Sequence, residues 1–105
     1  MEFNGQEGSP IDPTTAGDWT RRYRKANAGA TTGHFFGRAI LQKLLDESGS
    51  MGIRFYYGLA PDGTRQLVAV AANAAMNDLL EGTNIVADDA KMCPPCCSTP
   101  NVLNS

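Results

Sequence analysis

Three cysteines lie close together near the C-terminal end of the sequence, in the segment Cys93-Pro94-Pro95-Cys96-Cys97. Thiolates at this spacing can share a metal ion or close a small disulfide ring. A tetrahedral zinc site needs four ligands, so Cys93, Cys96 and Cys97 require a fourth from His34, the single histidine, or from a second chain. This segment has four interpretations: zinc binding, redox chemistry, a flexible tail of reduced or incidentally oxidised thiols, and a tail that a tailoring enzyme modifies after recognising the preceding domain as a leader.

The redox interpretation lacks one usual element. A thioredoxin-type site lies at the start of a helix, which lowers the pKa of the first thiol. Here two prolines separate the first two cysteines, and Ser98-Thr99-Pro100 follows. Because proline breaks a helix interior, we do not expect a helix after the cysteines.

The remaining charged residues do not assemble a catalytic site. Arg21-Arg22-Tyr23-Arg24-Lys25 crowds the end of an expected helix, where cations suit the negative end of the dipole. The net charge of −2 is not that of a general nucleic-acid binder, and we expect no nucleic-acid partner. No set of nucleophile, base and orienting group can be named, so a non-catalytic role is favoured.

Two helices are expected in the N-terminal half. Asp12-Pro13 is a typical helix start, and the first helix should run to about Asn27 with a buried stripe containing Trp19 and Tyr23. The second is expected over residues 34–48, ended by Gly49 in the left-handed conformation.

A β-hairpin is expected to follow, with strands over residues 52–59 and 66–72 joined by the turn Ala60-Pro61-Asp62-Gly63-Thr64. Pairing Ala60 with Thr64 puts Tyr57 opposite Leu67. The same register puts Phe55 opposite Ala69 and Ile53 opposite Ala71, on the face that we expect the helices to cover.

The other face of the hairpin carries Arg54, Tyr56, Val68 and Val70, which is too apolar to be left in water. Two alternatives would cover this face: residues 85–87 supply a third strand, or a second copy of the chain pairs at an edge of the hairpin. For residues 73–82, helix and loop are equally good predictions. We therefore predict a small non-catalytic interaction or regulatory module that forms a homo-oligomer or binds a protein partner through these four residues.

The predicted fold is α+β, with two N-terminal helices packed on a small antiparallel sheet built around the hairpin. We expect a single domain over residues 13–92, a flexible N-terminus over 1–12 and a flexible cysteine-containing tail over 93–105. No apolar stretch approaches a membrane span, and no secretory signal is recognisable, so a cytoplasmic location without membrane contact is expected.

Several segments together resemble those of a group of small bacterial proteins to which no activity is assigned. These are Trp19 with Tyr23, Phe35-Phe36-Gly37-Arg38 leading to Leu44-Leu45, Gly52-Ile53-Arg54-Phe55-Tyr56-Tyr57-Gly58, Asn77-Asp78-Leu79-Leu80 and the Cys-Pro-Pro-Cys-Cys tail. The resemblance covers most of the chain from residue 14 onward. It implies a self-contained bacterial domain and brings no catalytic residues to this sequence.

Overall fold

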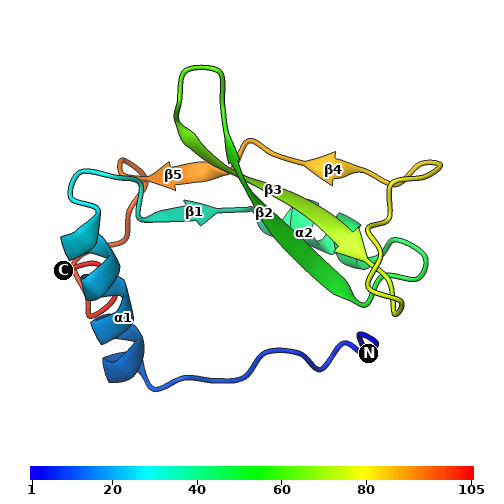
Figure 1. Ribbon diagram of the computed structural model, residues 1–105, viewed down its shortest axis with the longest axis horizontal. Coiled ribbons are helices and arrows are strands. Elements are labelled where there is room, and N and C mark those ends of the chain that lie inside the picture. Colours follow the sequence, from blue (N-terminus) through cyan, green and yellow to red (C-terminus); the bar gives the residue numbers. More distant parts are fainter. The chain divides into compact units, whose positions relative to one another are not determined.

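The computed structural model describes all 105 residues and contains two helices and two small antiparallel sheets, which confirms the α+β class. The sequence predicts one domain over residues 13–92, whereas the chain forms two compact units. The first unit comprises Met1–Glu7 and Phe36–Ala90, and the second comprises Gly8–Phe35 and Lys91–Ser105. Each unit contains one helix and one of the two sheets (Figure 1).

The sheet of the first unit has the strand order β2-β3-β4 (Figure 1). β2 (Gly52–Leu59) and β3 (Arg65–Ala72) form the predicted hairpin, and the predicted pairing of Tyr57 with Leu67 is confirmed. β4 (Val86–Ala87) pairs with the other side of β3, as expected for the third strand. Local sequence signals are therefore sufficient to specify this sheet.

The turn of the hairpin explains why its register was predictable. Ala60 donates its N–H to the Thr64 carbonyl oxygen at 2.9 Å, and Gly63 adopts a φ of 86°. The Asp62 carboxylate accepts hydrogen bonds from the Thr64 backbone N–H at 3.0 Å and from its hydroxyl at 2.7 Å. These bonds, the backbone one foremost, hold the pKa of Asp62 below its ordinary value.

Between β3 and β4 the chain forms a loop, which decides between the two predictions for residues 73–82. Asn73 donates its N–H to the Asn77 carbonyl oxygen and accepts the Asn77 N–H on Oδ1, both at 2.9 Å. Such local bonds compete with helical ones. After the loop, Ile85 donates its N–H to Glu47 Oε2 at 2.9 Å, so Glu47 binds the chain just before β4.

The helix of the first unit, α2 (Arg38–Leu45), is shorter than the helix predicted over residues 34–48. Its N-cap residue, Gly37, is extended and has no side chain to cap it, and residues 33–35 form a strand instead. The chain turns at Gly49 with a φ of 85°, as predicted. The start of the helix was predicted wrongly because the partner of residues 33–35 lies far away in the sequence.

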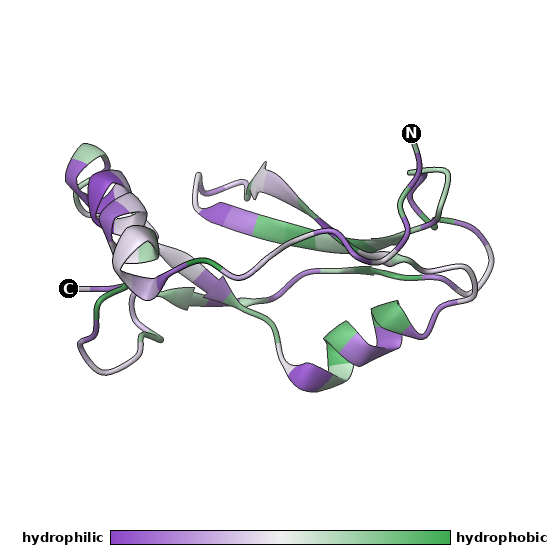
Figure 2. Ribbon diagram, turned by 90° about the horizontal axis from the view of Figure 1, so that it is seen from below, coloured by the Kyte–Doolittle hydropathy of each residue, from purple (hydrophilic) through white to green (hydrophobic).

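α2 packs on one face of the sheet and forms the core of the first unit. Leu44 is fully buried against Ala69, Ala71 and Ala87. Figure 2 shows hydrophobic positions alternating with hydrophilic ones along α2, as expected for a helix with one buried side. Five half-buried side chains surround this cluster: Phe36, Ile40, Ile53, Leu79 and Ile85.

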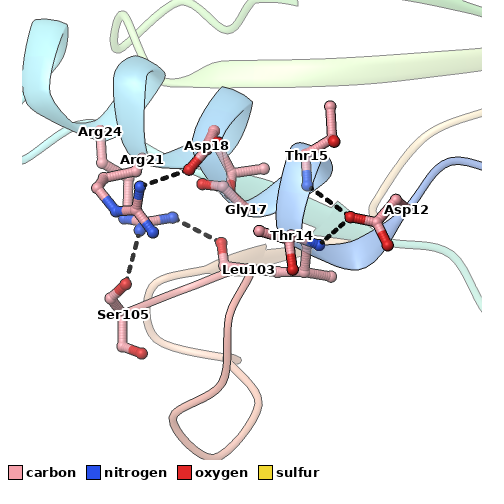
Figure 3. A network of polar contacts seen from close by, with 10 residues as sticks. Asp12, Thr14, Thr15, Gly17, Asp18, Arg21, Arg24, Leu103 and Ser105 are labelled. Atoms are coloured by element: carbon pink, nitrogen blue, oxygen red, sulfur yellow. Dashed lines mark hydrogen bonds and ion pairs between the residues drawn. The ribbon is translucent and has the colours of Figure 1, made fainter.

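The helix of the second unit, α1 (Pro13–Ala26), begins and ends close to the predicted positions. The Asp12 carboxylate caps it by accepting the N–H groups of Thr14 at 3.1 Å and Thr15 at 3.3 Å (Figure 3). The predicted buried stripe is wrong, because Trp19 and Tyr23 are exposed. α1 belongs to the second unit, whereas α2 contributes Leu44 to the core at the hairpin sheet.

The only buried residue of α1 is Gly17, which lies against the C-terminal segment. A Cβ built on Gly17 would lie 2.6 Å from Val102 Cγ2 and 2.7 Å from the Val102 carbonyl oxygen. Two helical turns further on, Arg24 donates hydrogen bonds to the carbonyl oxygens of Leu103 at 2.6 Å and Ser105 at 3.0 Å (Figure 3). The segment predicted as a flexible tail therefore folds back on α1.

A second, two-stranded sheet joins β1 (Gly33–Phe35) to β5 (Lys91–Cys93). The strands are antiparallel, with His34 opposite Met92. Thr32 extends the pairing by donating its N–H to the Cys93 carbonyl oxygen at 2.8 Å. The second unit thus brings the cysteine segment, Cys93 to Cys97, which begins at the last residue of β5, beside Gly33 at the start of β1.

Candidate functional site

The four predicted partner-binding residues lie on one face of the hairpin, as expected from the register. Arg54 is paired with Val70, and Tyr56 with Val68. Val70 is only 2% exposed and Val68 is half-buried, however, whereas the Tyr56 side chain remains 46% exposed. The apolar part of the predicted surface is therefore largely covered within the protein.

An unpredicted residue, Asp78, organises the polar part of this face. Its carboxylate forms an ion pair with the Arg54 guanidinium and accepts a hydrogen bond from the Tyr56 hydroxyl at 2.5 Å. Arg54 also donates to the Met76 carbonyl oxygen at 3.2 Å and stacks over the Phe3 ring, 5.4 Å from its centroid. We call Arg54, Tyr56 and Asp78 the Asp78 cluster.

The Asp78 cluster is suited to holding segments together. One Asp78 oxygen is bonded to Arg54 and the other to Tyr56. Through Arg54 the cluster ties the loop before β4 and the N-terminal segment to the sheet. The hydrogen bond to Asp78 raises the pKa of Tyr56 above its ordinary value of 10.0, and the corresponding bond raises the pKa of Arg54. The phenol and the guanidinium both donate to the Asp78 carboxylate, and such a cluster is suited to stabilising structure.

The sequence contained a signal for Asp78. A lone arginine on an otherwise apolar strand face needs a counter-charge, and Asp78 is the acid that follows β3 most closely. This signal indicates that an acid should pair with Arg54. It does not show that Asp78 reaches Arg54, because the irregular loop that carries Asp78 cannot be placed from periodicity.

Three exposed apolar or aromatic side chains of β2 lie instead on the opposite face, toward the tip of the hairpin. Tyr57 is 93% exposed, Leu59 74% and Phe55 43%. This face was expected to be covered, but α2 has eight residues and spans about 12 Å. β2 also has eight residues and spans about 27 Å, so α2 can cover less than half of it.

β2 is also an edge strand, with β3 as its only neighbour in the sheet. Ala60 bonds directly to Thr64, and backbone groups along an antiparallel strand point alternately toward and away from the neighbouring strand. The even-numbered residues of β2 therefore direct their N–H and C=O groups toward β3, and the odd-numbered residues direct theirs outward. These are Ile53, Phe55, Tyr57 and Leu59. We call these four residues the β2 edge.

The β2 edge lacks the features that usually protect an edge strand, which are lysine, proline, a bulge or inward-pointing charge. Its four side chains are uncharged and apolar or aromatic. The nearest charge on the strand, that of Arg54, is neutralised by Asp78 on the other face. No unpaired charge on β2 therefore opposes the addition of a further strand at the β2 edge.

In the second unit, Cys93 and Cys97 form a disulfide with a Cα–Cα distance of 4.8 Å, and Cys96 is a free, exposed cysteine. The Thr32 hydroxyl lies 3.4 Å from Cys93 Sγ. With this bond in place, no group of three or more His, Cys, Asp or Glu side chains is arranged to hold a metal ion. Zinc binding by Cys93, Cys96 and Cys97 would thus require prior reduction.

The disulfide borders an open cleft of about 320 Å³ within the second unit. Thr32 and Arg24 lie on its wall together with Cys93, Cys97 and residues of the C-terminal segment. The Arg24 guanidinium is engaged by the carbonyl oxygens of Leu103 and Ser105. The cleft therefore gives access to the disulfide and offers few uncommitted polar groups.

Comparison with protein-family models, curated proteins and solved structures finds no match. Neither α1 nor α2 combines the length and apolar character that a membrane-crossing helix needs. The β2 edge and the cysteine segment are the two sites from which a function can be argued.

Proposed function

We propose that this protein is a small non-catalytic interaction module, which binds an extended segment of a protein partner as an additional strand along the β2 edge. The single observation that supports the proposal is the edge position of an eight-residue strand whose Phe55, Tyr57 and Leu59 side chains are exposed. Backbone hydrogen bonds would supply affinity, and the alternate side chains would supply specificity.

The proposal revises the location of the interaction surface. Sequence patterns favoured Arg54, Tyr56, Val68 and Val70, but burial of Val70 and the bonds of Arg54 to Asp78 leave that face with Tyr56 as its main exposed part. The β2 edge combines unpaired backbone groups with exposed apolar side chains, so it is the better candidate.

Selection from a library of random eight-residue peptides, followed by NMR mapping, tests this function. Selected peptides should shift the amide signals of Phe55, Tyr57 and Leu59 most strongly, because those groups face outward. A Tyr57→Lys variant should bind the same peptides roughly tenfold more weakly, because lysine protects an edge. Failure to recover peptides at concentrations where the protein is monomeric, or perturbations confined to other strands, would overturn the proposal.

A second candidate is thiol–disulfide exchange by the cysteine segment. It is supported by the disulfide beside an open cleft and by the free thiol of Cys96 next to it. The thiolate of an incoming thiol would attack Cys93 or Cys97, forming a mixed disulfide and releasing the other sulfur as a thiolate. In the reduced state, the three thiolates would be available to zinc, with a fourth ligand from elsewhere.

Native mass spectrometry after alkylation distinguishes these thiol states. Protein purified without reductant should carry one alkyl group, on Cys96, and three after reduction. In a separate sample that is not alkylated, zinc should add to the mass of the reduced protein and not to that of the protein before reduction. Alkylation of all three cysteines without reductant would remove the redox candidate, and a reduced protein that takes up no zinc would remove the metal candidate.

A further inference from the structure

The sequence of the β2 edge indicates which strand would pair with it. We infer that the added strand is β2 of a second copy of this chain, paired antiparallel to form a symmetric dimer with a continuous sheet. The inference rests on the proposed function and specifies the partner.

Backbone geometry restricts how two such strands can pair. Only residues with outward groups can exchange hydrogen bonds, so odd-numbered residues must lie opposite odd-numbered residues. One antiparallel register uses all four residues of the β2 edge on both copies. It places Phe55 opposite the partner's Tyr57 and Ile53 opposite the partner's Leu59.

Side-chain chemistry is self-complementary in this register. Phe55 with the partner's Tyr57 is an aromatic cross-strand pair, and Ile53 with the partner's Leu59 is an aliphatic one. On the other face, Arg54 lies opposite the partner's Gly58, so no like charges meet. Tyr56 lies opposite the partner's Tyr56 at the symmetry axis, in a pair without mutual hydrogen bonds, where side chains approach most closely.

The antiparallel arrangement also covers the apolar surface that α2 leaves exposed. α2 packs at the Ile53 end of β2, where Phe36 contacts the Phe55 ring at a centroid distance of 5.6 Å. In the dimer, the uncovered tip of the partner's hairpin, with the partner's Leu59, comes to that end. Each copy thereby supplies the apolar contacts that the other copy lacks.

No other strand offers an equal alternative. β3 is paired on both sides, β4 has two residues, and β1 and β5 have three each. β2 is thus the one long strand with an unoccupied side in its sheet. A closed contact through identical patches is also the commonest form of homo-oligomer.

Sedimentation equilibrium in a Cys96→Ser background tests the dimer without interference from an intermolecular disulfide. The protein should associate to a dimer between micromolar and millimolar concentrations. Tyr57→Lys should raise the dissociation constant at least about tenfold, because it places lysine opposite the partner's Phe55. Val86→Lys on the exposed side of β4 adds the same charge, and Tyr57→Phe retains the aromatic ring. Neither of these two control variants should change the dissociation constant of the dimer by more than about twofold.

Crosslinking reads the register directly. Tyr56→Cys in the Cys96→Ser background should form an intermolecular disulfide, because the two Cα atoms lie at a bridgeable distance in a pair of this kind. Tyr57→Cys should not, because it faces the partner's Phe55. Crosslinking through residue 57 in preference to 56 would overturn the register.

Two outcomes would overturn the inference in distinguishable ways. A monomer at all concentrations that binds selected peptides along the β2 edge would remove the second copy as partner and leave the proposed function standing. A dimer unaffected by Tyr57→Lys would show that association uses another surface.

Discussion

Different kinds of interaction stabilise the first unit and the second unit internally. The first has an apolar core around Leu44 and a three-stranded sheet with a well-defined turn. The second buries only Gly17, and its parts are joined by a disulfide, by short strands and by the bonds of Arg24. Where a segment is too small to bury apolar surface, covalent and polar contacts take over the role of the core.

The largest expected effect comes from removing the centre of the apolar core. Leu44→Ala should destabilise the first unit by about 2–5 kcal/mol, because it leaves a cavity under the sheet. Denaturant unfolding followed by NMR should show early loss of the hairpin signals. Leu45→Ala provides a matched control, since Leu45 is exposed and its truncation should cost much less.

Opening the disulfide should affect the second unit selectively. Cys97→Ser should cost that unit about 2 kcal/mol, the value expected from the chain entropy of a short closed loop. Amide exchange should then quicken in β5 and the C-terminal segment while the hairpin of β2 and β3 keeps its protection. Cys96→Ser should leave both regions unchanged, and equal loss in the two units would contradict their separation.

A smaller effect is expected where the C-terminal segment approaches α1. Gly17→Ala should displace Val102, at a cost of about 1–3 kcal/mol in docking that is partly offset by about 1 kcal/mol of helix propensity. Methyl signals of Val102 report the displacement. Gly33→Ala is the control, because no atom lies within 4 Å of a Cβ at that position. An undisturbed Val102 would show that the close approach does not exist in solution.

The smallest expected effect is a change in titration. Because Asp78 raises the pKa of Tyr56, the folded protein should hold that proton above pH 10, and the associated stability should be lost as the pH rises through the folded pKa. Asp78→Ala should lower the Tyr56 midpoint toward 10.0 in an NMR titration. The exposed Asp88→Ala should leave it unchanged.

Sequence patterns predicted the first unit far better than the second. The register of the hairpin follows from Pro61-Asp62-Gly63 and from alternation, which are local signals. The strand pairing of Gly33–Phe35 with Lys91–Cys93 joins distant segments, so a helix start was predicted there in error.

The candidate site shows the same division between local and distant information. That Arg54 and Tyr56 share a face could be derived from the period of a strand. The binding of Asp78 to both Arg54 and Tyr56 could not be derived in this way, because it depends on the path of an irregular loop. The exposure of Tyr57 and Leu59 was missed because α2 proved shorter than its periodicity indicated.

The brevity of β4 limits what can grow from the sheet. A sheet with two long open edges can polymerise into filaments, since each added copy presents a new template. Here one side ends in a strand of two residues, Val86–Ala87. If a second copy adds at the other side, as we propose, a two-residue strand lies at each outer edge of the combined sheet, and such a short edge offers little template for further copies.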